Sequence, residues 1–152
     1  MPETHVVIYK EEDGTCPLLD WLDGLLPKAQ DKCIVRIERL AEKGHELRRP
    51  EAAPLRDKIY ELRAALQRIQ YRMLYFFYKK QCVITHGFIK KGSEVPQEEI
   101  SLAVTRKAKF EDNPMSHTRW VLSHIAKALN RHLTVQMTSV DEPRQIGTGI
   151  SC

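Results

Sequence analysis

Residues 55–91 decide the fold, because three strand-like stretches follow one another there: L-R-D-K-I-Y-E-L-R (55–63), Q-Y-R-M-L-Y-F-F-Y (70–78) and G-F-I-K-K (87–91). Their aromatic and β-branched content predicts strands over about 58–64, 69–77 and 82–89. Gln67-Arg68 and Lys79-Lys80 lie in the connections, which are short enough for hairpins between antiparallel strands. The stretch therefore predicts an antiparallel meander.

The middle strand shows which side chains share a face. Side chains alternate across a strand, so one face receives Tyr71, Met73, Tyr75 and Phe77, and the other receives Arg72, Leu74, Phe76 and Tyr78. Both sets contain large apolar groups. We expect helices to cover one face, and the other to be partly covered by a substrate or a partner.

Helices are predicted on both sides of this meander. After a strand over 5–9, Pro17 and Pro27 suit the first turns of two short helices, and Gly44 suits the end of the second. These two helices form an αα-hairpin, and residues 45–54 read as a loop. A third helix is predicted over 97–111, with Glu98 and Glu99 at its positive N-terminal end and a buried stripe of Ile100, Ala103, Val104 and Ala108. The fold class is α+β, with a mainly antiparallel sheet.

A change of composition divides the chain near residue 114. We predict one domain over 1–114 and a C-terminal extension over 115–152. The extension contains one possible amphipathic helix over 120–129, followed by a Gly-, Ser- and Thr-rich tail that we expect to be flexible. The extension either packs on the domain or on a second subunit, or it is a loosely attached appendage without effect on activity.

Composition indicates an ordinary globular protein. A length of 152 residues is enough for one domain with a core. The contents of 42% hydrophobic and 29% charged residues are typical of such domains. The N-terminus lacks the pattern of a secretory signal, and no apolar run approaches a membrane span, so we expect a cytoplasmic protein. The four cysteines (Cys16, Cys33, Cys82 and Cys152) are scattered, which favours reduced thiols over a disulfide framework or a zinc site.

Positive charge is concentrated in the strand-rich region. Residues 48–91 contain eleven Lys and Arg but only three acidic residues, a net charge of +8, whereas the whole chain carries +4. A basic surface of this kind attracts a polyanion. Together with the aromatic side chains, it favours RNA as a ligand.

Several kinds of catalytic site are absent from the sequence. The chain has no Walker-type glycine loop, no G-x-G-x-x-G, no G-x-S-x-G and no His/Cys cluster. RNA can nevertheless be cleaved without a metal or cofactor, since its own 2′-hydroxyl can attack the adjacent phosphodiester. Arginine suits the stabilisation of the phosphorane oxygens, and Lys, Tyr or His can transfer protons. Tyrosines or Phe88 could stack an unpaired base.

Four motifs in this region resemble a known family. The runs Y-E-L-R (60–63), Q-Y-R-M-L-Y-F-F (70–77) and H-G-F-I-K-K (86–91), with Pro96 before the last helix, are similar to the phage-derived branch of the RelE/HigB-type toxins. The resemblance covers about residues 4–112. It implies a microbial RelE-like RNase fold and an endoribonuclease that enters the ribosomal A site and cuts mRNA. It also implies a helix-turn-helix antitoxin as partner.

The resemblance also suggests site residues. Arg63 and Arg72 are the first candidates for phosphate contact and transition-state stabilisation, and Lys90 and Lys91 lie where the family places basic active-site residues. Further candidates for RNA binding are Lys58, Arg68, Tyr71, His86 and Phe88. The general acid and base are open among Lys90, Lys91, Tyr71 and His86, because the family's strand lysines and its Tyr near Pro96 have no counterpart here.

Other interpretations remain. Arg63 and Arg72 could simply pair with Glu61 and other acids, and His86 could be a structural histidine inside its strand. The same fold could bind RNA, the ribosome or an antitoxin without cleaving anything. A DNA-binding regulator ranks lower, because no basic recognition helix stands out before residue 115.

Overall fold

The computed structural model describes residues 4–114 and 117–119. Its elements, in chain order, are β1 (His5–Ile8), α1 (Pro17–Asp23), α2 (Pro27–Lys43), the 3-10 helix η1 (Gly44–Glu46), β2 (Ala52–Pro54), β3 (Tyr60–Leu66), β4 (Ile69–Tyr78), β5 (Gln81–Lys90), α3 (Gln97–Asp112) and β6 (Thr118–Arg119). The strands form one sheet in the order β2-β3-β4-β5-β1-β6. Only the β1–β5 pair is parallel, so the predicted α+β fold with a mainly antiparallel sheet is confirmed.

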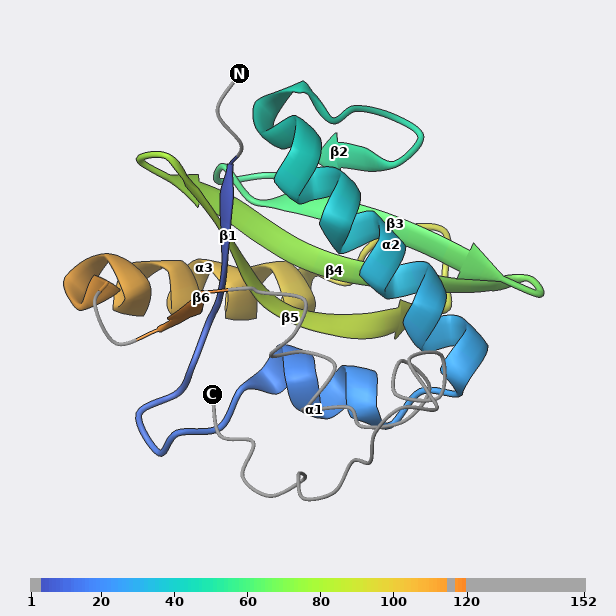
Figure 1. Ribbon diagram of the computed structural model, residues 1–152, viewed down its shortest axis with the longest axis horizontal. Helices are drawn as coiled ribbons and strands as arrows, with labels where there is room; N and C mark the ends of the chain where they lie inside the picture. Colours follow the sequence, from blue (N-terminus) through green and yellow to red (C-terminus); the bar gives the residue numbers. More distant parts are fainter. Residues whose placement is uncertain (1–3, 115–116, 120–152) are drawn as a thin grey trace, which may run out of the picture.

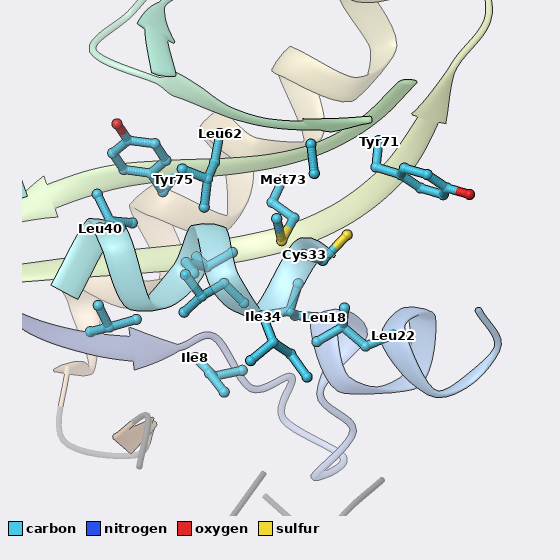
Figure 2. Packing of buried hydrophobic residues seen from close by; sticks show 14 of the residues in the cluster. Ile8, Leu18, Leu22, Cys33, Ile34, Leu40, Leu62, Tyr71, Met73 and Tyr75 are labelled. Atoms are coloured by element: carbon cyan, nitrogen blue, oxygen red, sulfur yellow. The ribbon is translucent and has the colours of Figure 1, made fainter. Parts of the chain in front are cut away.

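Helices lie on both faces of the sheet, as Figure 1 shows. α1 and α2 cover one face, where Leu18, Ile34 and Ile37 pack with Leu62 and Met73 of the strands. The labelled side chains of Figure 2 show strand residues and helix residues of this core facing one another. α3 covers part of the opposite face through Ile100, Ala103 and Phe110.

The central hairpins follow the prediction closely. Gln67 and Arg68 both have positive φ values of 51° and 71°, which is the backbone of a type I′ turn and matches the right-handed twist of the strands. β4 and β5 contain ten residues each, and the predicted alternation of β4 is confirmed: Met73 and Tyr75 lie in the α1/α2 core, whereas Leu74 and Phe76 lie in the α3 core.

Two local predictions differ from the structure, and one irregularity was not predicted. The predicted loop over 45–54 contains η1 and the edge strand β2. β2 has only three residues, one of them a proline, so its sequence does not have the pattern of a strand. In α3, Ala108 is exposed and Phe110 is buried instead, because the large ring reaches Phe76 and Tyr78 across the sheet. β5 also carries an extra residue, since Leu74 pairs with His86 but Tyr75 pairs with Ile84.

Residues 117–119, which lie in the predicted extension, are also described and contact β1. β6 pairs with β1 through Val7 and Ile8, and His117 stacks on Tyr9 with ring centroids 5.0 Å apart. The backbone N–H of Lys10 donates to His117 Nδ1 at 2.9 Å. The predicted helix over 120–129 and the predicted flexible tail lie outside the described residues.

The cysteines and the helices bear on two further expectations. Cys33 and Cys82 are free and buried, and burial raises the pKa of the Cys33 thiol to about 12. The reduced state predicted for the cysteines is confirmed at these two positions. Among the described residues, no helix combines the length and apolar character that crossing a bilayer requires.

Candidate functional site

The uncovered part of the α3 side of the sheet carries a group of polar and charged side chains. α3 packs over one end of this face, and beyond its N-terminus the strands carry Glu61, Arg63, Gln70, Arg72 and Lys90, which we call the open polar face. Cross-strand pairing places them in rows: Arg63 is opposite Arg72, which is opposite Phe88, and Gln70 is opposite Lys90. Directly opposite side chains on one face are near neighbours, so the sheet places Arg63 beside Arg72, and Lys90 lies diagonally from Arg72 on the neighbouring strand.

Glu61 lies between the two arginines. Its Oε1 accepts from Arg72 Nε at 2.9 Å, and its Oε2 accepts from Arg63 Nη2 at 2.7 Å and from Arg63 Nε at 3.1 Å. The Glu61 side chain is only 5% exposed, so this carboxylate is a buried bridge between two guanidinium groups. The pairing with Glu61 that the sequence left open as an alternative is therefore present.

The two arginines differ in access to solvent. The Arg72 side chain is 7% exposed and the Arg63 side chain 30% exposed. Arg72 Nη1 also donates to Tyr71 O at 3.1 Å and to Gln70 Oε1 at 3.3 Å. Burial lowers the pKa of the Arg72 guanidinium, the nearby Arg63 charge lowers it further, and the Glu61 carboxylate opposes both effects. Arg72 is fixed in place, whereas Arg63 can exchange one partner for another.

Lys90 completes the open polar face on β5, and Phe88 borders it. Lys90 Nζ donates to Gly92 O at 2.8 Å in an exposed setting. Phe88 is buried beside Val95 and Ile100, so most of its ring is covered by the segment that leads into α3. Lys91 is exposed just after the end of β5.

His86 is a buried residue next to this face. Its Nε2 donates to Glu99 Oε1 of α3 at 2.9 Å, and its Nδ1 lies 2.9 Å from the hydroxyl of Thr85, which donates to Leu74 O at 3.2 Å. Burial lowers the pKa of His86, and the hydrogen bond to Glu99 only partly opposes that effect. The imidazole therefore joins β5 to the first turn of α3, and its burial favours the uncharged form.

The remaining sequence candidates lie elsewhere. Tyr71 is buried on the α1/α2 side, where its ring lies 6.2 Å from that of Trp21, and Figure 2 shows it at the edge of that core. Lys58 is exposed in the connection between β2 and β3, and Arg68 is exposed in the β3–β4 turn. The structure does not bring these three together with Arg63, Arg72 and Lys90.

Residues that the sequence did not single out hold Arg63 from the α2 side. Arg36 Nε donates to Arg63 O at 2.6 Å, and Arg63 N–H donates to Glu51 O at 2.8 Å. The Glu51 carboxylate accepts from both Arg36 and Arg39, and its pKa is lowered chiefly by the hydrogen bond from Arg39. This network fixes the β3 backbone from which the Arg63 side chain projects.

The need for glycine at position 87 comes from the packing of Trp21 on the α1/α2 face. A Cβ atom at this position would lie 2.2 Å from Cε3 of Trp21, so the indole of α1 packs directly on the β5 backbone.

Within the described residues, no group of three or more His, Cys, Asp or Glu side chains could hold a metal ion. The site is thus built from a buried ion-pair bridge and a neighbouring lysine.

Comparison with known proteins places the chain in a family. Residues 20–108 match the family described as phage-derived Gp49-like proteins (DUF891). A comparison with curated proteins gave no match. The matched segment spans α1 to α3 and therefore includes every residue of the open polar face. The chain belongs to the phage-derived Gp49-like family, a family of the RelE-like toxin superfamily in toxin–antitoxin systems.

Proposed function

We propose that this protein is the toxin of a type II toxin–antitoxin pair and acts as a metal-independent endoribonuclease that cuts mRNA on the ribosome. The observation that supports this proposal most is the open polar face, on which Arg63, Arg72 and Lys90 lie together. The protein would act in the cytoplasm, where translating ribosomes are found, and its partner would be a helix-turn-helix antitoxin.

The proposed reaction uses the RNA's own 2′-hydroxyl as nucleophile. The 2′-oxygen bonds to phosphorus and loses its proton, the bond from phosphorus to the 5′-oxygen breaks, and the 5′-oxygen takes up a proton. The products are a 2′,3′-cyclic phosphate and a 5′-hydroxyl. Neither oxidation nor reduction takes place, so the chain needs only charge stabilisation and proton transfer.

Each role can be given to a named group. Arg63 is the more exposed arginine, and its fork can turn from Glu61 to the scissile phosphate, because guanidinium binds either oxyanion bidentately. That movement frees Glu61 Oε2 to accept the 2′-hydroxyl proton, while Arg72 holds Glu61 Oε1. Lys90 is the group in position to donate the proton to the leaving 5′-oxygen, since its ammonium lies exposed beside the same rows.

A second candidate function is binding without cleavage. It is favoured by one observation, namely that Glu61 already occupies both arginines. In that case the basic surface would contact RNA, the ribosome or the antitoxin, and the transcript would stay intact.

Cleavage of mRNA on purified translating ribosomes separates the two functions. The parent protein is expected to produce cut transcripts, and Arg72→Ala to reduce the rate by ~100-fold or more, because Glu61, the proposed base, then loses the guanidinium that holds its Oε1. Arg48→Ala, an exposed arginine outside the open polar face, serves as control. If the parent blocks translation but leaves every transcript whole, the binding function is correct; if Arg72→Ala cuts as fast as the parent, the role given to Arg72 is wrong.

A further inference from the structure

A groove of about 610 Å³ lies between α2 and the last residues of β3. Its α2 side consists of Lys28, Asp31, Lys32, Val35 and Arg36, and its β3 side of Ala64, Ala65 and Leu66. None of these residues belongs to the open polar face. The groove therefore calls for a separate account.

The floor of the groove is an unpaired strand edge. β2 pairs with β3 only from Tyr60 to Leu62, and the backbone turns away at Arg48, whose O accepts from Ala52 N–H at 3.1 Å. Arg63 directs its N–H toward Glu51 and its C=O toward Arg36, that is, away from β4. Backbone direction repeats every second residue, so the N–H and C=O of Ala65 also point outward. Within the described residues, no backbone group bonds to Ala65 from that side.

The α2 side of the groove combines an apolar patch with positive charge. Val35 is 55% exposed and Leu66 is half-buried beside it. Lys28 and Lys32 are exposed and lie one helical turn apart on α2. Arg36 is already engaged by Arg63 O and Glu51. Lys28 and Lys32 outnumber Asp31, the one acid in the lining, so the groove offers a net positive charge to an incoming group.

We propose that this edge, together with the flanking side of α2, binds an extended segment of a partner protein that carries acidic and apolar side chains. Such a segment would add a strand beside β3, with its backbone bonded to Ala65, an apolar side chain on Val35 and Leu66, and carboxylates near Lys28 and Lys32. RNA fits less well: its phosphates would meet the lysines, but the peptide groups of Ala65 and the exposed Val35 would gain no partner. The proposal goes beyond RNA cleavage and does not depend on it.

Selection from random peptides of about ten residues displayed on phage tests the proposal on the full chain. Peptides in which acidic residues alternate with β-branched residues are expected to be enriched, since one extended segment must satisfy both the edge and the lysines. Amide chemical shifts of the protein on addition of an enriched peptide are then expected to change at Ala65 and Leu66.

Two variants test the two parts of the proposed contact. Ala65→Pro removes the outward N–H without removing a bond to β4, and proline is tolerated at such an edge; Lys32→Glu reverses one charge. Each is expected to weaken peptide binding by about fivefold. Lys80→Glu, in the β4–β5 turn away from the groove, is expected to change it by less than about twofold.

Each other outcome overturns the proposal. These outcomes are that no peptide is enriched, that basic peptides are enriched, or that the enriched peptides bind Ala65→Pro and Lys32→Glu as tightly as the parent. A single-stranded oligoribonucleotide that shifts the Ala65 and Leu66 amides more than any peptide would make the groove an RNA surface instead. Since Ala65→Pro could disturb the β3–β4 hairpin, Lys32→Glu and the shift map decide if that variant does not fold. None of these measurements involves RNA cleavage, so failure here leaves the proposed nuclease activity untouched.

Discussion

The two faces of the sheet differ in how their side chains are satisfied. On the α1/α2 face, two helices cover the strands, and rings such as Tyr60, Tyr75 and Phe77 pack against one another. On the opposite face, α3 reaches only part of the strands, and the uncovered part relies on the Glu61 bridge between Arg63 and Arg72. Where no helix supplies apolar contact, charge pairing replaces packing, and charged groups then lie close enough to solvent to meet a ligand.

The largest effect is expected from removing the bridge. Glu61→Ala leaves Arg72 buried without its carboxylate, which costs ~3–5 kcal/mol for a broken buried pair. Adding Arg72→Met should restore a good part of that loss, because an apolar side chain needs no counter-charge. Urea unfolding of the parent, the single variant and the double variant measures both. A Glu61→Ala protein as stable as the parent would show that the bridge does not stabilise the open polar face.

A smaller loss of stability is expected from a substitution at Gly87, on the α1/α2 face of the sheet. Gly87→Ala places a Cβ where Trp21 packs, and overpacking of this kind costs ~1–3 kcal/mol. In a chain that already carries Trp21→Ala, adding Gly87→Ala should change the free energy of unfolding very little, since the clash with the indole is then gone. Gly92→Ala is the matched control, because no atom lies within 4 Å of a Cβ there. Equal losses in stability for Gly87→Ala and Gly92→Ala would contradict the close packing of α1 on β5.

The smallest effect concerns pH and the boundary between the open polar face and α3. Burial lowers the pKa of His86 from its ordinary 6.5, so below about pH 6.5 the unfolded chain takes up a proton that the folded chain refuses. The free energy of unfolding should therefore fall as the pH falls, by at most ~1.4 kcal/mol per pH unit for one group. His86→Gln should flatten this slope, although His117, whose pKa burial also lowers, will keep some of it. The measurement is thermal unfolding of the parent and of His86→Gln at pH 7.5 and pH 5.5. If both proteins lose the same stability between these two pH values, His86 is not the source of the pH dependence.

Periodicity predicted the faces of the sheet but not everything that lies on them. The alternation through Tyr71, Arg72, Met73 and Leu74 is a local property of a strand, and the structure follows it. The parallel pairing of β1 with β5 and the edge strand β2 depend on contacts between distant residues. Neither leaves a local pattern in the sequence.

The candidate site was predictable in part. That Arg63 and Arg72 share a face follows from antiparallel pairing across a two-residue turn. The position of Glu61 two residues before Arg63 placed it on the same face, and that spacing was the available signal for the bridge. A structural role for His86 was one of the interpretations, but its bond to Glu99 was not readable, because it depends on where α3 begins and on the extra residue in β5. Tyr71 was assigned to a face correctly, but only the packing of Trp21 shows that its ring is covered.

The central claim is that the open polar face cleaves RNA, and Arg63→Ala tests it most directly because this arginine is half-exposed and its removal leaves Arg72 paired with Glu61. The measurement is the rate of mRNA cleavage on purified translating ribosomes, with thermal unfolding as a check on folding. We expect Arg63→Ala to unfold at nearly the parent's temperature and to cleave ~100-fold more slowly, with Arg48→Ala like the parent. Cleavage by a folded Arg63→Ala at the parent's rate would contradict the claim.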